Sequence, residues 1–214
     1  MAVILFFGDS ITSGLWDEEG GWVARVSKHL IKKTLASNFE EYYQAYNLGM
    51  SGDSTGGLVS RFEKELRVRV EREEGEEIVI VFAIGINDTY TFHKEGRENV
   101  SLENFKKNLT TLVALAQKFT SQIVFVGLTP VDEALVDPVP WRPEIAYTQD
   151  LVQTYNDALK VFCDEKQLLF IDMLKEWMTK DYKKLLIDGL HPNTEGHENM
   201  ASLIIKELEE QHIF

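Results

Sequence analysis

The chain has 214 residues, a formal net charge of -13 and one cysteine, and these bulk properties exclude several classes of protein. The length suits one compact unit with a sizeable core, so we predict a single domain over residues 1–214. A domain this acidic repels phosphate backbones, which argues against nucleic acid as a partner. The sequence has no run long enough for a membrane span and no signal-peptide pattern, so we expect no membrane insertion and a cytoplasmic location.

Apolar runs bounded by turn residues alternate with amphipathic runs along the chain, and these patterns are typical of buried parallel strands and of helices. We predict strands at residues 3–7, 43–48, 78–84, 123–126 and 168–171. We predict helices at residues 22–35, 55–73, 101 onward, 144–164 and 193 onward. The alternation predicts an α/β fold with a parallel sheet that helices cover on both faces.

The segment Leu128–Pro143 interrupts this alternation, because it is long, irregular and rich in proline. Long loops in compact domains often form a wall or lid of a functional site. A rigid surface excursion with no functional role is the other interpretation, and the sequence leaves both open.

Three short polar motifs each follow a predicted strand directly: Gly8-Asp9-Ser10-Ile11-Thr12, residues 47–54, and Gly85-Ile86-Asn87-Asp88. The carboxyl ends of parallel strands meet at one edge of a sheet, and open α/β sheets bind their ligands there. We therefore expect these motifs, which are distant in sequence, to converge in space.

The fourth motif, Asp188-Gly189-Leu190-His191-Pro192-Asn193, stands directly before the last predicted helix. A serine hydroxyl is a poor nucleophile at neutral pH and needs an adjacent base whose tautomer is fixed by a third group. The carboxylate of Asp188 could hold one imidazole nitrogen of His191 while the other nitrogen faces Ser10. We therefore predict that these three residues are the orienting group, the base and the nucleophile.

Acyl transfer also needs hydrogen-bond donors aimed at the charge that develops on the carbonyl oxygen. We predict three such donors: the backbone N–H of Ser10, the backbone N–H of Gly52 and the side-chain amide of Asn87. Gly52 carries no side chain that could cover its N–H, and Asn87 follows a neighbouring strand. Together with the nucleophile and base, these donors meet the requirements of an acyl-transfer site.

The four motifs resemble the sequence blocks of the SGNH hydrolases, also called the GDSL esterase/lipase family, and occur here in the expected order. Ser10 matches the family's nucleophile, Gly52 the glycine of the second block, and Asn87 the asparagine of the third. Asp188 and His191 match the final Asp-x-x-His block. The resemblance implies a three-layer α/β/α sandwich with a flavodoxin-like, five-stranded parallel sheet, hydrolysis of carboxylic esters, and no metal or organic cofactor.

The remaining polar and aromatic residues of these segments have structural interpretations. We expect Asp9 and Asp88 to brace their loops by hydrogen bonds. Cys163 lies in a helical pattern and reads as a small apolar filler. Among the other histidines, we expect His197 to face solvent. Further residues stand as surface or pocket-border candidates: His29, His93, His212, Trp16 and Trp141.

Two other functions compete with the leading prediction, a serine esterase acting on short-acyl, small soluble substrates. Gly-Asp and Gly-x-Asn-Asp segments with a late histidine loosely resemble a two-metal phosphoesterase, but only His191 is well placed and no His-x-His pair occurs. A non-enzymatic binding module could share the architecture, yet the phosphate-binding glycine motifs are missing. The physiological ester and the oligomeric state are not readable from the sequence.

Overall fold

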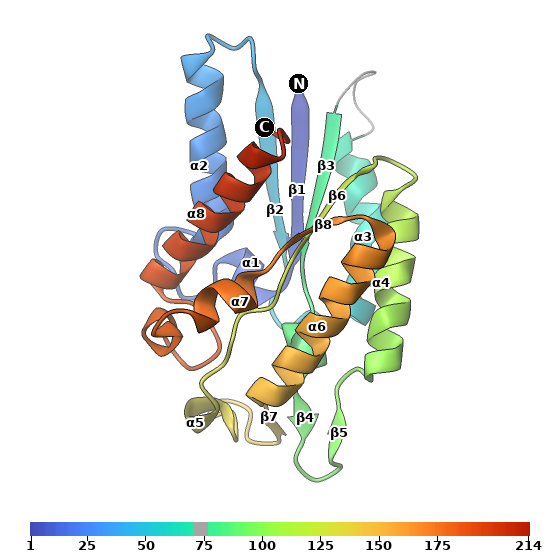
Figure 1. The fold of residues 1–214 in the computed structure, drawn as a ribbon, viewed down its shortest axis with the longest axis vertical. Coiled ribbons are helices and arrows are strands. Elements are labelled where there is room, and N and C mark those ends of the chain that lie inside the picture. The colour runs from blue at the N-terminus through green and yellow to red at the C-terminus, as the bar shows by residue number, and fades with distance from the viewer. Residues whose placement is uncertain (71–76) are drawn as a thin grey trace.

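A five-stranded parallel sheet forms the centre of the computed structural model, which describes residues 1–70 and 77–214 (Figure 1). Its strands are β1 (Ala2–Gly8), β2 (Tyr43–Gly49), β3 (Glu77–Ala83), β6 (Gln122–Val126) and β8 (Leu169–Ile171). The spatial order is β2-β1-β3-β6-β8, which is the 2-1-3-4-5 order of flavodoxin-like folds. The predicted fold class and all five predicted strands are confirmed.

Helices cover both faces of the sheet, and this confirms the three-layer α/β/α arrangement (Figure 1). On one face α2 (Gly21–Ala36) packs along α8 (Thr194–Glu210). The other face carries α3 (Thr55–Val70), α4 (Leu102–Ala116) and α6 (Gln149–Lys166). The predicted end of the second helix, residues 71–73, lies outside the described residues.

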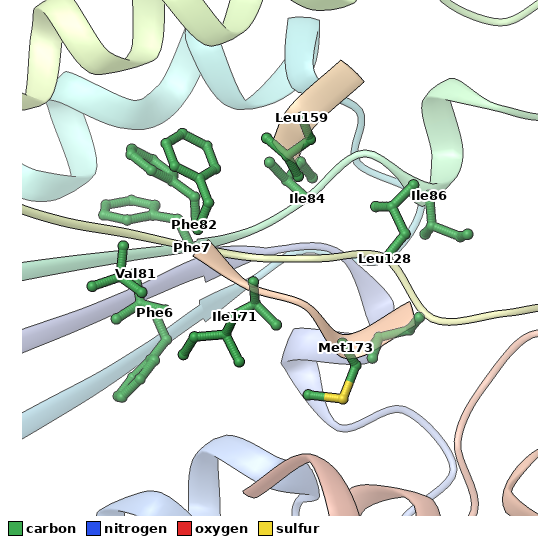
Figure 2. Packing of buried hydrophobic residues seen from close by; sticks show 14 of the residues in the cluster. Phe6, Phe7, Val81, Phe82, Ile84, Ile86, Leu128, Leu159, Ile171 and Met173 are labelled. Carbon is green, nitrogen blue, oxygen red and sulfur yellow. The ribbon is translucent and has the colours of Figure 1, made fainter. Parts of the chain in front are cut away.

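The core follows from the pleat of the strands, because successive side chains of a strand point to opposite faces. Phe6 meets Trp22 of α2 edge to face at 5.3 Å, whereas Phe7 meets Phe62 of α3 at 4.8 Å. Figure 2 shows Phe6 and Phe7 on opposite sides of the sheet. Since both faces are buried, the strands read as continuous apolar runs, and this is why the sequence located them.

The helix predicted at residues 144–164 begins later, at Gln149, where Thr148 caps it by accepting a hydrogen bond from the Leu151 N–H. The residues before it belong to a second, antiparallel sheet made of β4 (Thr91–Phe92), β5 (Arg97–Glu98) and β7 (Ile145–Ala146). Strands of two residues carry no periodic signal, so the sequence could not predict this sheet. It lies beyond the carboxyl ends of the parallel strands (Figure 1).

Short elements follow the ends of several parallel strands along the chain. They are the helices α1 (Ser10–Ser13), α5 (Glu133–Val136) and α7 (Met173–Met178), with the 3-10 turns η1 (Ile86–Asp88) and η2 (Tyr182–Leu185). Within the described chain, no helix is both long enough and apolar enough to span a bilayer. Cys163 is fully buried in α6, as the sequence predicted.

The expectation that His197 faces solvent is wrong, because its side chain is fully buried. It lies on the face of α8 that packs toward α2, in register with Met200, Ala201 and Ile204. Neither ring nitrogen makes a well-formed hydrogen bond with the rest of the described chain. Burial lowers the pKa of His197 from 6.5 to about 4.

Replacing His197 by leucine should therefore change how the free energy of unfolding depends on pH. Between pH 6.5 and about 4 the unfolded chain binds a proton that the folded chain refuses, so the parent protein loses stability as the pH falls through this window. Urea denaturation should give a constant difference between variant and parent above pH 6.5. Below it the difference should move in favour of the variant by up to about 1.4 kcal/mol per pH unit. A difference independent of pH would contradict this assignment.

Candidate active site

Ser10 stands at the end of β1 as the first residue of α1, so the helix does not use its backbone N–H. Asp9 caps this helix: its Oδ1 accepts a hydrogen bond of 2.9 Å from the Ile11 N–H, which is the predicted bracing role. Burial raises the pKa of Asp9 to about 7. Only glycine fits at residue 8, because a Cβ there would lie 2.3 Å from the carbonyl oxygen of Ala83.

The structure brings Ser10, His191 and Asp188 together, although 181 positions separate the serine from the histidine. The Oγ of Ser10 lies 2.9 Å from Nε2 of His191. The other ring nitrogen, Nδ1, lies 2.7 Å from Oδ2 of Asp188. All three side chains therefore form one continuous line of hydrogen bonds at the carboxyl end of the sheet.

The turn that carries Asp188 and His191 is held by the same carboxylate. Its second oxygen, Oδ1, accepts hydrogen bonds from the backbone N–H groups of Leu190 at 3.0 Å and His191 at 2.8 Å. Burial alone would raise the pKa of Asp188, but the hydrogen bonds from the His191 ring and backbone lower it below its usual value. Asp188 thus stays ionised at neutral pH, as a group that stabilises a positively charged imidazole must.

Gly52 occupies a tight turn in which the Asp53 N–H donates to the carbonyl oxygen of Met50 at 3.0 Å. Its φ of 78° is the left-handed value that the third residue of a type II turn requires and that favours glycine. A Cβ at this position would meet nothing within 4 Å. The backbone conformation rather than lack of space therefore explains the glycine.

Asn87 is buried in η1, and each end of its side-chain amide has a partner. Nδ2 donates to the backbone carbonyl of Asp53 at 2.9 Å, and Oδ1 accepts from the phenol of Tyr147 at 2.8 Å. Its own carbonyl accepts from the Asn99 side chain at 2.9 Å. The amide of Asn87 thus ties the second and third motifs together and leaves one N–H of Nδ2 without a role in this network.

Two further side chains connect the loops of the site. Asp88 is fully buried and accepts hydrogen bonds from the Thr55 N–H and hydroxyl, so it braces its loop as predicted. The guanidinium of Arg61 in α3 donates to the carboxylate of Asp53 at 2.8 Å, to the Gly8 carbonyl at 2.9 Å and to the Leu48 carbonyl of β2 at 3.0 Å. Sequence reasoning missed Arg61, because nothing local distinguishes it from the other basic residues of a helix.

The segment Leu128–Pro143 packs against the turn that carries the histidine. The Asp132 N–H donates to the Gly189 carbonyl at 2.8 Å, and the ring of Trp141 lies 6.0 Å from that of His191. Trp141 nevertheless keeps 54% of its surface exposed. The segment therefore borders the site, and Trp141 offers an open aromatic face next to the imidazole.

Two other histidines have acidic partners of their own. His29 contacts Glu209 at 2.9 Å, and His93 contacts Asp137 of the 128–143 segment at 3.3 Å. In the part of the chain that the structure describes, no three His, Cys, Asp or Glu side chains are grouped so that they could hold a metal ion. The site as described consists of a hydroxyl, an imidazole, a carboxylate and amide donors.

Comparison with known proteins gives the family. The family model described as "GDSL-like Lipase/Acylhydrolase family" matches residues 6–198. The chain belongs to this family. It is a carboxylic ester hydrolase of the GDSL type, and this removes the case for a metal-dependent phosphoesterase or a non-enzymatic binding module.

Relatives of this GDSL hydrolase align along most of their length. The "GDSL esterase/lipase CPRD49" of Arabidopsis thaliana is 28% identical over 97% of this chain and 78% of its own. The "Isoamyl acetate-hydrolyzing esterase 1 homolog" of Homo sapiens is 22% identical over 93% of this chain and 78% of its own. Among solved structures, the lipase/acylhydrolase from Enterococcus faecalis superposes with a TM-score of 0.75, at 25% identity and covering 99% of this chain and 97% of its own.

Proposed function

We propose that this GDSL hydrolase is a serine esterase that cleaves its substrate through an acyl-enzyme on Ser10. The observation that carries the proposal is the line of hydrogen bonds from Ser10 Oγ to His191 Nε2 and from His191 Nδ1 to Asp188. This is the arrangement that a nucleophilic serine needs, with a base in reach and a third group that fixes the tautomer of the base.

In the first step, Ser10 Oγ forms a bond to the ester carbonyl carbon while its proton moves to Nε2 of His191. The electron pair of the C=O bond moves to the carbonyl oxygen. The negative charge there is stabilised by the N–H groups of Ser10 and Gly52 and by the free N–H of Asn87. The bond to the leaving alcohol then breaks, and the alcohol oxygen takes the proton from His191.

In the second step, water repeats this sequence on the acyl-enzyme. His191 removes a proton from the water as its oxygen attacks the acyl carbon. The bond to Ser10 breaks, the proton returns to Oγ, and the free acid leaves. Asp188, ionised throughout, stabilises the imidazolium of both steps.

We further propose that the substrates are small esters with a short acyl group. One curated relative is named for the hydrolysis of isoamyl acetate, an ester of this class. The exposed face of Trp141 lies beside His191, the residue that delivers the proton to the leaving alcohol, and it therefore suits contact with the alcohol part. Cytoplasmic location and the lack of a nucleic-acid partner stay predictions from the sequence.

A panel of p-nitrophenyl esters of increasing acyl length tests this proposal. Hydrolysis should be fastest on the short esters, should survive EDTA, and should stop after treatment with an organophosphate or a sulfonyl fluoride. Mass spectrometry of the inactivated protein should find the adduct on the peptide that contains Ser10. Loss of activity with EDTA, or an adduct elsewhere, would count against the serine mechanism.

Replacing Asn87 by alanine should lower kcat by about 10²–10³-fold, because one donor to the developing oxyanion is lost. KM should change much less, since the donor matters most when charge has formed. The exposed Asn104 in α4 provides the matched control, and Asn104→Ala should leave both constants unchanged. Equal kcat values for Asn87→Ala and the parent enzyme would remove Asn87 from the oxyanion site.

A further inference from the structure

We infer that Tyr147 is a positioning residue of the reaction: its phenol holds the side-chain amide of Asn87 with an N–H turned toward the oxyanion. The inference rests on the proposed function, since it assigns a partner to one of the proposed oxyanion donors. Tyr147 belongs to none of the four sequence motifs, and it directly follows β7 of the small antiparallel sheet.

The hydrogen bonds around Asn87 fix which end of its amide faces which partner. The backbone carbonyl of Asp53 can only accept, so the atom 2.9 Å from it must be Nδ2. The oxygen end therefore faces Tyr147, and the phenol must donate to it across 2.8 Å. With one N–H on Asp53 and the oxygen on Tyr147, the second N–H of Asn87 is the only polar group of the amide left for a substrate.

The phenol is a dependable donor. Tyr147 is only 3% exposed, and burial raises the pKa of its hydroxyl, so it stays protonated at every pH at which an esterase is assayed. Without that donor, the buried oxygen of Asn87 has no partner on this side, and the amide is held at one end only. A swing of the amide away from its place would move the catalytic N–H, and displacements of about 1 Å are costly in rate.

The ring of Tyr147 is itself fixed from several directions. Its backbone N–H donates to the Val136 carbonyl at 3.1 Å, and its ring meets that of Tyr90 edge to face at 5.8 Å. The preceding residues pair with β4, where Ala146 opposes Thr91. The small sheet therefore places the phenol beside the amide of Asn87, although 60 positions of sequence separate the two residues.

Tyr147→Phe removes the hydroxyl and keeps the ring, and it should lower kcat about tenfold with KM changed less than twofold. Tyr155→Phe is the matched control, because Tyr155 is also a buried tyrosine with a hydrogen-bonded phenol. Its phenol donates to the backbone carbonyl of Val100 at 2.5 Å. Both variants lose one buried hydrogen bond and should lose stability. Only Tyr147→Phe should lose kcat, so a merely structural effect would appear as equal kcat values in the two variants and would overturn the inference.

A double-mutant cycle gives the second readout. In an Asn87→Ala background, Tyr147→Phe should have no further effect on kcat, because the phenol acts only through the amide. A full tenfold loss in that background would show a different role for Tyr147 and contradict the inference. If the proposed function itself is wrong, the result is different, because Ser10→Ala and Asn87→Ala would then leave kcat unchanged.

Discussion

Replacing Ser10 by alanine is expected to reduce kcat by about 10⁶-fold on every ester that the parent enzyme hydrolyses. The variant has no atom that can bond to the acyl carbon, so the two-step route is closed. What remains is the effect of substrate binding and of the proposed oxyanion donors, including the backbone N–H that alanine keeps at residue 10, on direct attack by water, which is far slower. The comparison is made from initial rates on the best ester of the panel.

The control for this experiment must separate chemistry from folding. Ser10 is almost fully buried, but the substitution removes a single hydroxyl, so circular dichroism and urea denaturation should differ little from the parent. Ser27→Ala removes a comparable hydroxyl from α2, where it donates to the Val23 carbonyl at 2.9 Å, and should keep full activity. Near-parent rates for Ser10→Ala would refute the serine mechanism.

Much of this site could be predicted from the sequence because the fold places strand ends together. Apolar runs located the five parallel strands, and the residues that follow three of them, including Ser10, Gly52 and Asn87, meet at one edge of the sheet. The motif of Asp188 and His191 added the imidazole that the structure places beside Ser10. Local sequence was sufficient here because each of these residues lies close to the end of a predicted strand or the start of a predicted helix.

The supporting groups could not be predicted, because their roles depend on contacts between distant positions. Tyr147 reaches Asn87 from a strand of two residues, and Arg61 reaches the ends of two strands from the side of a helix. His197 follows His191 on the last helix and was expected to face solvent, yet the packing of α8 on α2 buries it. Periodicity reports which face is apolar, and a polar residue on the buried face escapes it.

Replacing His191 by alanine should cost about as much as losing the nucleophile, about 10⁶-fold in kcat. Without the imidazole, Ser10 Oγ loses the base that lies within hydrogen-bond distance of it among the described residues, and the alkoxide that could attack unaided is not populated at neutral pH. His29→Ala is the control, because His29 belongs to none of the site motifs and its ring contacts Glu209 and Phe214, and it should retain the parent rate.

The double variant of Ser10 and His191 distinguishes a cooperating pair from two independent contributors. In the proposed mechanism, His191 exchanges protons with Ser10 Oγ, 2.9 Å from its ring, with the leaving alcohol and with the attacking water, and all of these transfers belong to the route through Ser10. Once Ser10 is alanine, removal of the imidazole should therefore cost little more, and the double variant should match the slower single variant within about tenfold. Losses that multiply would mean that His191 serves some step that Ser10 does not share, and the two-step mechanism would have to be abandoned.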